Sequence, residues 1–595
     1  MVTMRRTVEC LLYALIAGLP FEYYFRTPEQ SLYSTLKLQV VLFVAAWAIL
    51  KILSASHDGF RVLQEFANLT SRRLLIALLL FVLSQVAAAA FASEARSNAA
   101  TAAAKTVVGA LVFLAANDLS REGKFPRALL AALSLSGLCV ALIGFGDFAG
   151  IAIFRDAIAL FQYQRFRITD RLRFQSTMEY PTIAGHFLSV SLFASLALIL
   201  RTKPERENAP RLSLWMSGAA FQAAGLGLTY SRGSVGAAIL AIALASRVFR
   251  RSSPGLFWKG TVAACLAILA MGIVNQLYVH YAGDSRSPRR VARTARFGLA
   301  GDDEIKYLLP GREYSEKIVV RNESSKIWTR GKFGVAYRWH VLGEPASTDL
   351  KSGALFKEDL LPGQDREIDV MMMTPPVEGE YLLLWFVYER DLSITALQGS
   401  FSPGIVCKIS SLTDQTATIL SDKAQYVAKL IRDERRGMKI RDVPGRMELW
   451  TAALRMFHSR PWLGIGPDNF RLLKWKYMEI PGGDERILAN SLYFETLSGS
   501  GLIGLASLLW LLIEFGRGIA IRYRLAVTPE ERAIAYFGIA FFTAFVTHSL
   551  VDYFLKFTPT FLLFWIVMGA LAPVESMHKT ADGALPDGRA TDTHG

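Results

Sequence analysis

Residues 181–200 read PTIAGHFLSVSLFASLALIL and contain no Asp, Glu, Lys or Arg. A helix needs about 20 consecutive, mostly apolar residues to cross a lipid bilayer, so this stretch predicts a transmembrane helix. Seven more runs lack these four charged residue types, and four weaker apolar runs bring the prediction to about twelve spans. In chain order the other runs are Val8–Tyr24, Leu32–Ser54, Leu74–Ser93, Ala99–Asn117, Ala128–Gly146, Leu212–Ser231, Ser234–Phe249, Gly260–Gly283, Thr496–Ile513, Ala533–Val551 and Phe557–Val574.

The composition and charge of the chain agree with an all-α polytopic membrane protein. Of the 595 residues, 52% are hydrophobic and 20% are charged, whereas soluble domains carry about 25% charge. The net charge of +15 gathers in alternate connections between the apolar runs, which the positive-inside rule assigns to the cytoplasm. We therefore expect both termini inside, residues 281–489 outside and no nucleic-acid partner. The four cysteines lack zinc-site spacing and no nucleotide-binding loop is present, so we expect no metal and no cofactor.

The large outer segment divides the chain into further parts. We expect transmembrane helices in residues 1–280 and 490–575, a linker at 281–301, a helical segment at 411–489 and a disordered cytoplasmic tail at 576–595. Between them, residues 302–410 show short β-rich runs separated by Pro-Gly turns, which indicates an inserted β-sandwich that looks immunoglobulin-like. The runs are Ser315–Asn322, Gly334–His340, Arg366–Met372 and Tyr381–Tyr388. We expect Trp328, Trp339 and Trp385 in its core, with sugar-stacking platforms as the alternative.

One predicted outer loop breaks the charge rule because it is rich in arginine. It contains Arg165, Arg167, Arg171 and Arg173, interleaved with aromatic residues. Such a segment is typical of a membrane interface with anionic headgroups. It would equally suit a diphosphate-bearing lipid substrate, because the arginine fork matches phosphate oxygens. The sequence leaves both interpretations open.

Three short motifs resemble the O-antigen ligase/polymerase superfamily. They are SRG at 231–233, RMELWTAALRMFHSRPWLGIGPDNF at 446–470 and NSLYFETLSGSGLIG at 490–504. In the last, Asn490 and Ser491 precede Gly501 and Gly504 at the spacing of the ligase pattern. The second motif also predicts a helix that Pro461 ends, with Met447, Trp450 and Leu454 among its apolar stripe. We expect the likeness to cover about spans five to twelve and to leave out the β-sandwich.

Two residues depart from the pattern of the superfamily. Asn490 stands where the ligases have histidine, and Gly499 stands where a glutamate is usual. The resemblance implies a glycosyltransferase of the bacterial inner membrane with a large periplasmic loop. Its donor would be an undecaprenyl-diphosphate-linked glycan, and its acceptor another glycan or lipid A-core. The missing histidine favours a polymerase or an exopolysaccharide variant over a ligase.

The ends of two predicted spans suit a diphosphate. Span eight begins outside at Ser231-Arg232, and span ten begins outside at Asn490-Ser491. Serine and asparagine are good N-caps, and a helix N-terminus carries a partial positive charge that favours phosphate. Arg232 could instead be an interfacial anchor, and Asn490 could be only a cap.

Other candidate residues lie close to these helix ends in sequence. Arg446 would add a second guanidinium to stabilise the leaving diphosphate, although it could simply pair with Glu448. Glu495 lies about one helical turn into span ten and is the candidate base, because an intramembrane carboxylate is costly and usually functional. His548 and Asp552, four residues apart, could bond to each other or line the pocket.

The sequence leaves two other classes of protein open. A lipid-linked oligosaccharide flippase would also need many spans, although transporters often show related halves and buried mid-membrane charges. The chain shows no clear internal repeat, and its conspicuous charges gather at the outer edge. A non-catalytic glycolipid-binding homologue is the other alternative.

Overall fold

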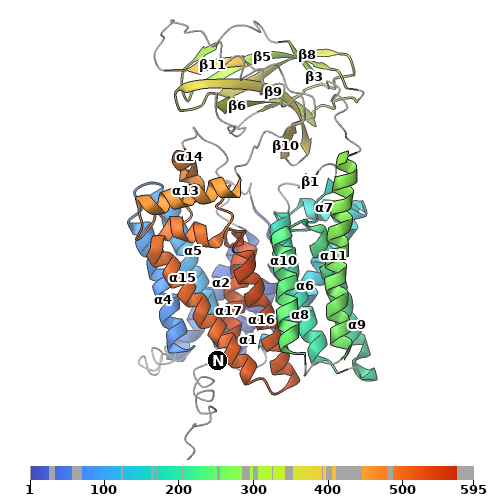
Figure 1. Ribbon diagram of the computed structural model, residues 1–595, viewed down its shortest axis with the longest axis vertical. Helices are drawn as coiled ribbons and strands as arrows, with labels where there is room; N and C mark the ends of the chain where they lie inside the picture. Colours follow the sequence, from blue (N-terminus) through green and yellow to red (C-terminus); the bar gives the residue numbers. More distant parts are fainter. Residues whose placement is uncertain are drawn as a thin grey trace, which may run out of the picture. The chain divides into compact units, whose positions relative to one another are not determined.

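The computed structural model divides the chain into two compact units, a helical unit and a β unit. The helical unit comprises residues 1–279, 457–469 and 490–595, and the β unit comprises residues 280–456 and 470–489 (Figure 1). The structure describes residues 2–25, 34–55, 70–121, 125–161, 167–168, 171–203, 205–250, 255–284, 295–298, 306–324, 326–341, 353–391, 393–396, 405–410, 445–478 and 487–572.

The helical unit contains helices that overlap every one of the twelve predicted spans. They pack around a common apolar core, with α5 against α17, α10 against α16, α8 against α9 and α15 against α4. The helices are α1 (Val2–Gly18), α2 (Thr35–Ala55), α4 (Arg72–Ala90), α5 (Arg96–Ser120), α6 (Phe125–Phe148), α8 (Pro181–Arg201), α9 (Ala209–Leu228), α10 (Arg232–Val248), α11 (Gly255–Asp284), α15 (Leu492–Arg524), α16 (Pro529–His548) and α17 (Thr558–Leu571). Short elements join them: α7 (Ala152–Ala159), β1 (Arg167–Ile168), β2 (Arg171–Leu172), η1 (Arg206–Asn208) and η2 (Phe554–Lys556).

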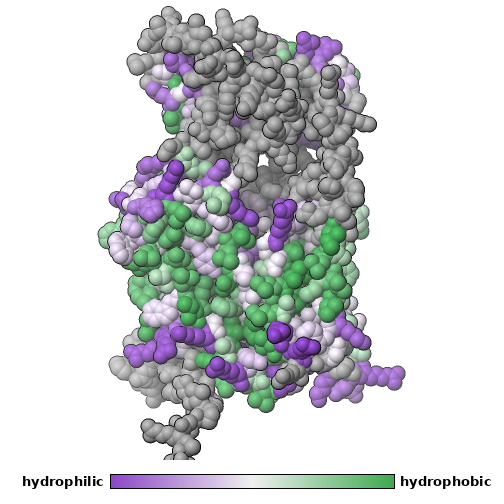
Figure 2. Space-filling view, in the orientation of Figure 1, coloured by the Kyte–Doolittle hydropathy of each residue, from purple (hydrophilic) through white to green (hydrophobic). Residues whose placement is uncertain are grey.

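Six helices are long and apolar enough to cross a membrane by length and composition. Among the described residues these candidates lie in α2, α4, α5, α6, α8 and α15, and α8 is buried throughout its hydrophobic window. The helical unit also exposes large apolar side chains, such as Leu83 and Leu266. Figure 2 shows a hydrophobic zone between polar ends on one face of the helices. Exposed apolar surface of this extent needs a lipid covering, as in a polytopic membrane protein. Twelve spans and their orientation stay predictions.

Helix α15 is interrupted at Gly501, which has φ +65° and ψ −161°. The loop from Pro461 to Gly466 fits into this break. The N–H groups of Leu502 and Ile503 donate to the carbonyl oxygens of Pro461 and Trp462, at 2.8 and 3.3 Å. In return, Ile465 and Gly466 donate to the carbonyl oxygens of Ser498 and Gly499, at 3.0 and 2.9 Å. Four loop–helix hydrogen bonds therefore satisfy backbone groups that an uninterrupted helix would pair internally.

The β unit consists of two sheets that share one apolar core. One sheet has the order β4-β11-β9-β6-β7, with β10 paired to β9, and the other has the order β3-β5-β8. The strands are β3 (Ala295–Gly298), β4 (Lys306–Leu308), β5 (Glu313–Asn322), β6 (Phe333–Val341), β7 (Gly353–Leu355), β8 (Asp365–Met373), β9 (Gly379–Asp391), β10 (Ser393–Ala396) and β11 (Ile405–Ile409). The four predicted strands are confirmed as β5, β6, β8 and β9. Trp328, Trp339 and Trp385 are buried in the core, as expected.

Some boundaries differ from the sequence-based expectation. The expected linker at 281–301 contains the end of α11 and strand β3, which pairs antiparallel with β5. The sheet therefore begins upstream of residue 302. The second motif forms α13 (Arg446–Ser459), followed by α14 (Phe470–Met478). The predicted apolar stripe of α13 was partly wrong. Met447 is 70% and Leu454 is 40% exposed, whereas Leu449, Ala452 and Met456 are buried. Residues 411–444 and the tail 576–595 lie outside the described residues.

Candidate functional site

The segment between α16 and α17, residues 548–557, joins most of the candidate residues of the helical unit. It starts at His548, which is buried and lies at the end of α16. The Nε2 atom of His548 is 3.3 Å from the Ser234 hydroxyl oxygen and 3.7 Å from Oδ2 of Asp552. His548 and Asp552 therefore lie close to each other but beyond hydrogen-bond distance, and the contact between His548 and Ser234 connects α16 to the start of α10.

The N-terminus of α10 is capped as predicted. Ser231 is the N-cap residue, and its side chain accepts a hydrogen bond from the Ser234 N–H at 3.4 Å. The hydroxyl oxygens of Ser231 and Ser234 lie 2.6 Å apart. A Cβ atom on Gly233 would come within 3.0 Å of the His548 ring, so glycine permits this close approach. Arg232 is exposed at the first helical position, and no acid in the described part of the chain forms an ion pair with it.

The N-terminus of α15 meets the same segment. The Leu492 N–H donates to the carbonyl oxygens of Ser549 and Asp552, at 3.0 and 3.2 Å. The buried Ser491 hydroxyl donates to the Ser549 carbonyl oxygen at 3.4 Å. The prediction that Asn490 caps this helix was wrong by one residue, because the N-cap residue is Ser491. Asn490 has φ +51°, a left-handed conformation that asparagine tolerates.

Arg173 adds a cation beside the start of α10. Its Nε donates to the Thr229 carbonyl oxygen at 3.0 Å, and the Thr229 hydroxyl accepts from the Ser231 N–H at 3.2 Å. Burial lowers the pKa of Arg173, and the Asp552 carboxylate acts in the opposite direction. A guanidinium remains charged under these conditions, so Arg173 is a partly buried positive group near Ser231 and Asp552.

Glu495 lies in the first turn of α15 and is only 4% exposed. Its neighbour Tyr553 has a pKa well above its usual value, first because of burial and then because of the negative charges of Glu495 and Asp468. The Asp468 carboxylate forms an ion pair with Lys556. A buried carboxylate and a phenol therefore lie near each other at the N-terminal end of α15, and an ion pair lies in the same region.

Two ionisable residues near this region were missed by the sequence analysis. Lys105 in α5 donates to the carbonyl oxygens of Leu555 and Lys556, at 3.2 and 2.6 Å. His186 in α8 stacks on Phe554, with ring centroids 4.0 Å apart. Both side chains hold the 554–556 turn in place. The available signal was an ionisable residue inside a predicted apolar span, which is usually functional or structurally paired.

The described structure does not show the remaining candidate residues at the site around residues 548–552. Arg446 is exposed at the start of α13 and belongs to the β unit. Arg165 lies outside the described residues. Arg167 and Arg171 form the short β1–β2 ladder, in which Ile168 pairs with Arg171, and only their backbone is described. In the part of the chain that the structure describes, no three His, Cys, Asp or Glu side chains gather as metal ligands.

The arrangement gathers groups that attract an anionic ligand. The N-termini of α10 and α15 are both bonded to residues 548–552, and a helix N-terminus favours phosphate. Arg173 and Arg232 lie at the start of α10, and Glu495 lies in the first turn of α15. Apolar helices with polar and charged groups gathered at one end therefore define a membrane protein with a candidate anion site.

The comparison with protein families confirms the predicted resemblance. Residues 381–509 match the family model described as O-antigen ligase. This match supports the resemblance of the segment to the O-antigen ligase/polymerase superfamily and suggests a glycosyltransferase-like enzyme. The matched stretch begins inside β9, so it overlaps the β region that we expected the likeness to leave out.

Comparisons with individual proteins add nothing to this family match. No curated protein matches the chain. Among solved structures, "Pseudomonas fluorescens alkylpurine DNA glycosylase AlkC bound to DNA containing an abasic site analog" aligns with 58% of this chain and 99% of its own at 10% identity. The TM-score of 0.17 is too low to support any argument about fold or function.

Proposed function

We propose that the chain is a glycosyltransferase of the bacterial inner membrane. It transfers or polymerises a glycan from an undecaprenyl-diphosphate-linked donor on the periplasmic face. The observation that carries the proposal is the connection of two helix N-termini, those of α10 and α15, to the single segment 548–552. The O-antigen ligase family match, which includes the α15 N-terminus, supports it.

In this proposal the chain stabilises the leaving diphosphate. An acceptor hydroxyl oxygen forms a bond to the sugar C1, the bond from C1 to the phosphate oxygen breaks, and the diphosphate leaves with its electron pair. Arg232, Arg173 and the α10 N-terminus would hold the developing negative charge, which is where electrostatic catalysis has its largest effect. Arg446, which belongs to the β unit, stays a candidate for this role from the sequence alone. Glu495 would accept the proton that the hydroxyl loses, with Tyr553 beside it.

The acceptor in the proposal is another lipid-linked glycan rather than lipid A-core. Asn490 cannot accept a proton as the histidine of the ligases could, so the base must be a different group. The side chain of Ser491 is directed to the protein backbone, which leaves it a structural role in holding the α15 N-terminus. We therefore favour a polymerase or exopolysaccharide variant over a ligase.

A transporter of lipid-linked oligosaccharides is the second candidate, and the break in α15 is the observation that favours it. Broken helices often bind substrate through backbone groups that the break releases. In this chain the loop 461–466 already satisfies the N–H groups of Leu502 and Ile503 and the carbonyl groups of Ser498 and Gly499. The break therefore offers little backbone to a transported ligand, and the transferase remains the better proposal.

The experiment that tests the transferase is reconstitution of the full chain in lipid nanodiscs with undecaprenyl-diphosphate-linked repeat units. We expect release of undecaprenyl diphosphate together with a lengthened glycan. Movement of intact donor across proteoliposomes, with no cleaved donor, would instead identify the chain as a transporter. Binding of donor with neither cleavage nor movement would identify a non-catalytic homologue.

The proposed orientation predicts the result of reporter fusions. A fusion at Ala489, just before α15, should report a periplasmic position, and a fusion at Lys203, just after α8, should report a cytoplasmic one. The reason is the excess of Lys and Arg in the connections assigned to the cytoplasm. Paired alkaline phosphatase and green fluorescent protein reporters measure both sides in the same strain. The reverse pattern at these two sites would contradict a periplasmic reaction.

A further inference from the structure

Two neighbouring helices of the helical unit, α4 and α15, carry exposed apolar faces. The helices pack against each other (Figure 1), and Figure 2 shows hydrophobic surface over them. The exposed large apolar side chains are Ile76, Leu79, Leu80, Leu83 and Val86 on α4, and Leu502, Ile503, Leu509, Trp510 and Ile513 on α15. These positions recur at three, four and seven residues, so in each helix they lie on one face.

The two ends of these faces differ in chemistry. At one end Arg72 and Arg73 are exposed at the start of α4, and Arg517 is exposed on α15. At the other end two large aromatic side chains are exposed: Phe91, the C-cap residue of α4, by 69%, and Trp462 by 65%. Helix α4 has 19 residues and is therefore about 28 Å long, close to the hydrocarbon thickness of about 30 Å. The arginines and the aromatic residues are thus separated by about one bilayer core.

The aromatic residues are joined by an arginine, and together we call Phe91, Arg460 and Trp462 the Trp462 cluster. The Nη1 atom of Arg460 donates to the Phe91 carbonyl oxygen at 2.9 Å. The Trp462 carbonyl oxygen accepts from the Ile503 N–H at 3.3 Å, so the cluster adjoins the apolar face of α15 as well as that of α4. Arg460 is exposed, and a guanidinium has five N–H donors, so the bond to Phe91 leaves others for an anion.

A lipid–water interface suits this combination of side chains. An indole ring has an apolar body and a polar N–H, and tryptophan is enriched where the acyl chains meet the headgroups. An arginine at the same level binds the headgroup phosphates. A glycan or a second copy of the chain could cover Trp462, but neither accounts for the apolar faces that continue from it along two helices. A bilayer surface accounts for both.

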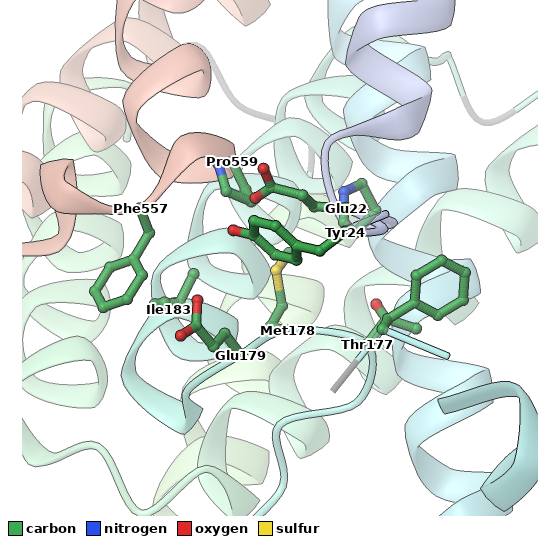
Figure 3. A pocket seen from close by; sticks show the side chains of 10 residues that line it. Glu22, Tyr24, Thr177, Met178, Glu179, Ile183, Phe557 and Pro559 are labelled. Carbon is green, nitrogen blue, oxygen red and sulfur yellow. The ribbon is translucent and has the colours of Figure 1, made fainter. Parts of the chain in front are cut away.

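A pocket inside the helical unit is too small for the same lipid. It lies between the α1–α2 connection, the segment that leads into α8 and the start of α17, and Glu22, Thr177 and Phe557 are among its lining residues (Figure 3). Its free volume is about 20 Å³, which is room for about one water molecule. An acyl chain does not fit there, whereas the exposed faces of α4 and α15 can accept one along their length.

We propose that the Trp462 cluster anchors the C-terminal end of α4 and the break in α15 in the headgroup layer of a lipid bilayer. The acyl chains cover the apolar faces of the two helices, and anionic headgroup phosphates bind Arg460. Because the loop 461–466 is bonded to the break in α15, the anchor also fixes the depth of the helical turn that carries Glu495. The proposal does not depend on the reaction that the chain catalyses.

The first test measures the depth of Trp462 in the full chain, reconstituted in nanodiscs of phosphatidylcholine and phosphatidylglycerol. The acyl chains carry bromine, a fluorescence quencher, either near the headgroup or near the chain end. Subtracting the emission of Trp462→Phe from that of the wild type gives the emission of Trp462, and Trp510→Phe gives that of Trp510 as the matched control. Bromine near the headgroup should quench Trp462 at least about twofold more than bromine near the chain end, since half the hydrocarbon core is about 15 Å deep. The order should reverse for Trp510, which lies about 12 Å beyond Leu502 along α15.

Three results of this test would overturn the anchor. Stronger quenching of Trp462 by bromine near the chain end would place the indole too deep. Quenching by aqueous iodide but by neither brominated lipid would place it in water, where a glycan could reach it. Resistance to iodide and to both lipids would place it under protein, either the β unit or a second copy of the chain.

The second test concerns the headgroup contact of Arg460. The same nanodiscs contain phosphatidylglycerol with a photoreactive headgroup, and mass spectrometry measures the lipid attached to the peptides that contain Phe91 and Trp462. Arg460→Gln should lower this yield by about fivefold, the usual contribution of one basic residue beside an anionic surface. The glutamine amide can still donate to the Phe91 carbonyl oxygen, so the loop should keep its place. Arg330→Gln, on an exposed turn of the β unit, is the control and should leave the yield unchanged. Equal yields for Arg460→Gln and the wild type would overturn the phosphate contact.

Discussion

Arg232→Lys should lose most of the transferase activity while the protein still inserts in the membrane. Arg232 is the first residue of α10, its side chain is exposed, and the neighbouring Ser231 caps the helix. A lysine keeps the charge but lacks the planar fork that binds two phosphate oxygens at once. Loss of one such contact in the transition state should cost about 2–4 kcal/mol, or about 10²–10³ in rate.

The measurement is undecaprenyl diphosphate released per unit of inserted protein, followed over a range of donor concentrations. Arg247→Lys is the matched control, because it lies exposed in the last turn of the same helix. It should retain wild-type turnover. A lysine at position 232 that leaves turnover within a factor of about two would show that Arg232 is an interfacial anchor.

Gly501→Ala should destabilise the helical unit enough to prevent accumulation of folded protein. The glycine has φ +65° and ψ −161°, a region that residues with a Cβ atom almost never occupy. The added Cβ would lie 2.4 Å from both the carbonyl carbon and the carbonyl oxygen of Trp462. The loop 461–466 would have to leave the break, and its hydrogen bonds to α15 would be lost. We expect a loss of more than about 3 kcal/mol, above the usual range for backbone strain alone.

Thermal unfolding of the detergent-purified chain measures this effect, together with the yield of inserted protein. Gly236→Ala is the control, because this glycine lies within α10 and a Cβ there would meet nothing within 4 Å. Alanine should leave stability equal or slightly higher at that position, since it is the better helix former. Equal melting temperatures for Gly501→Ala and Gly236→Ala would show that the loop and the helix break are not needed for stability.

The helices and strands could be predicted because their signals are local. Charge-free apolar runs located the helices, and alternating β-rich runs between Pro-Gly turns located four strands. The capping role of Ser231 could also be predicted, because serine opens an apolar helix there. The one-residue error at Asn490 arose because asparagine and serine are both good caps. In the structure Ser491 has extended backbone angles and its carbonyl oxygen accepts from the Glu495 N–H at 2.9 Å, so the helix starts after Ser491.

The contacts that assemble the site depend on residues far apart in the chain. The loop at 461–466 meets the break at Gly501 only in the folded protein. No local sequence pattern predicts that the two segments will form backbone hydrogen bonds with each other. The same is true of His548 beside Ser234 and of Lys105 beside the 555–556 carbonyls. In α13 the apolar stripe was misplaced because apolar residues occur on more than one face of the helix.

The interruption of α15 also bears on how deep the candidate base lies. The helix has 33 residues, and the part after Gly501, Leu502–Arg524, accounts for 23 of them. At about 1.5 Å per residue this part is about 34 Å long, enough to cross about 30 Å of hydrocarbon by itself. The turn that carries Glu495 then has no need to enter the acyl chains and can remain at headgroup depth. Phosphates of a membrane-anchored lipid lie at that level, so the carboxylate and the scissile bond can meet without drawing a charged group into the oily interior.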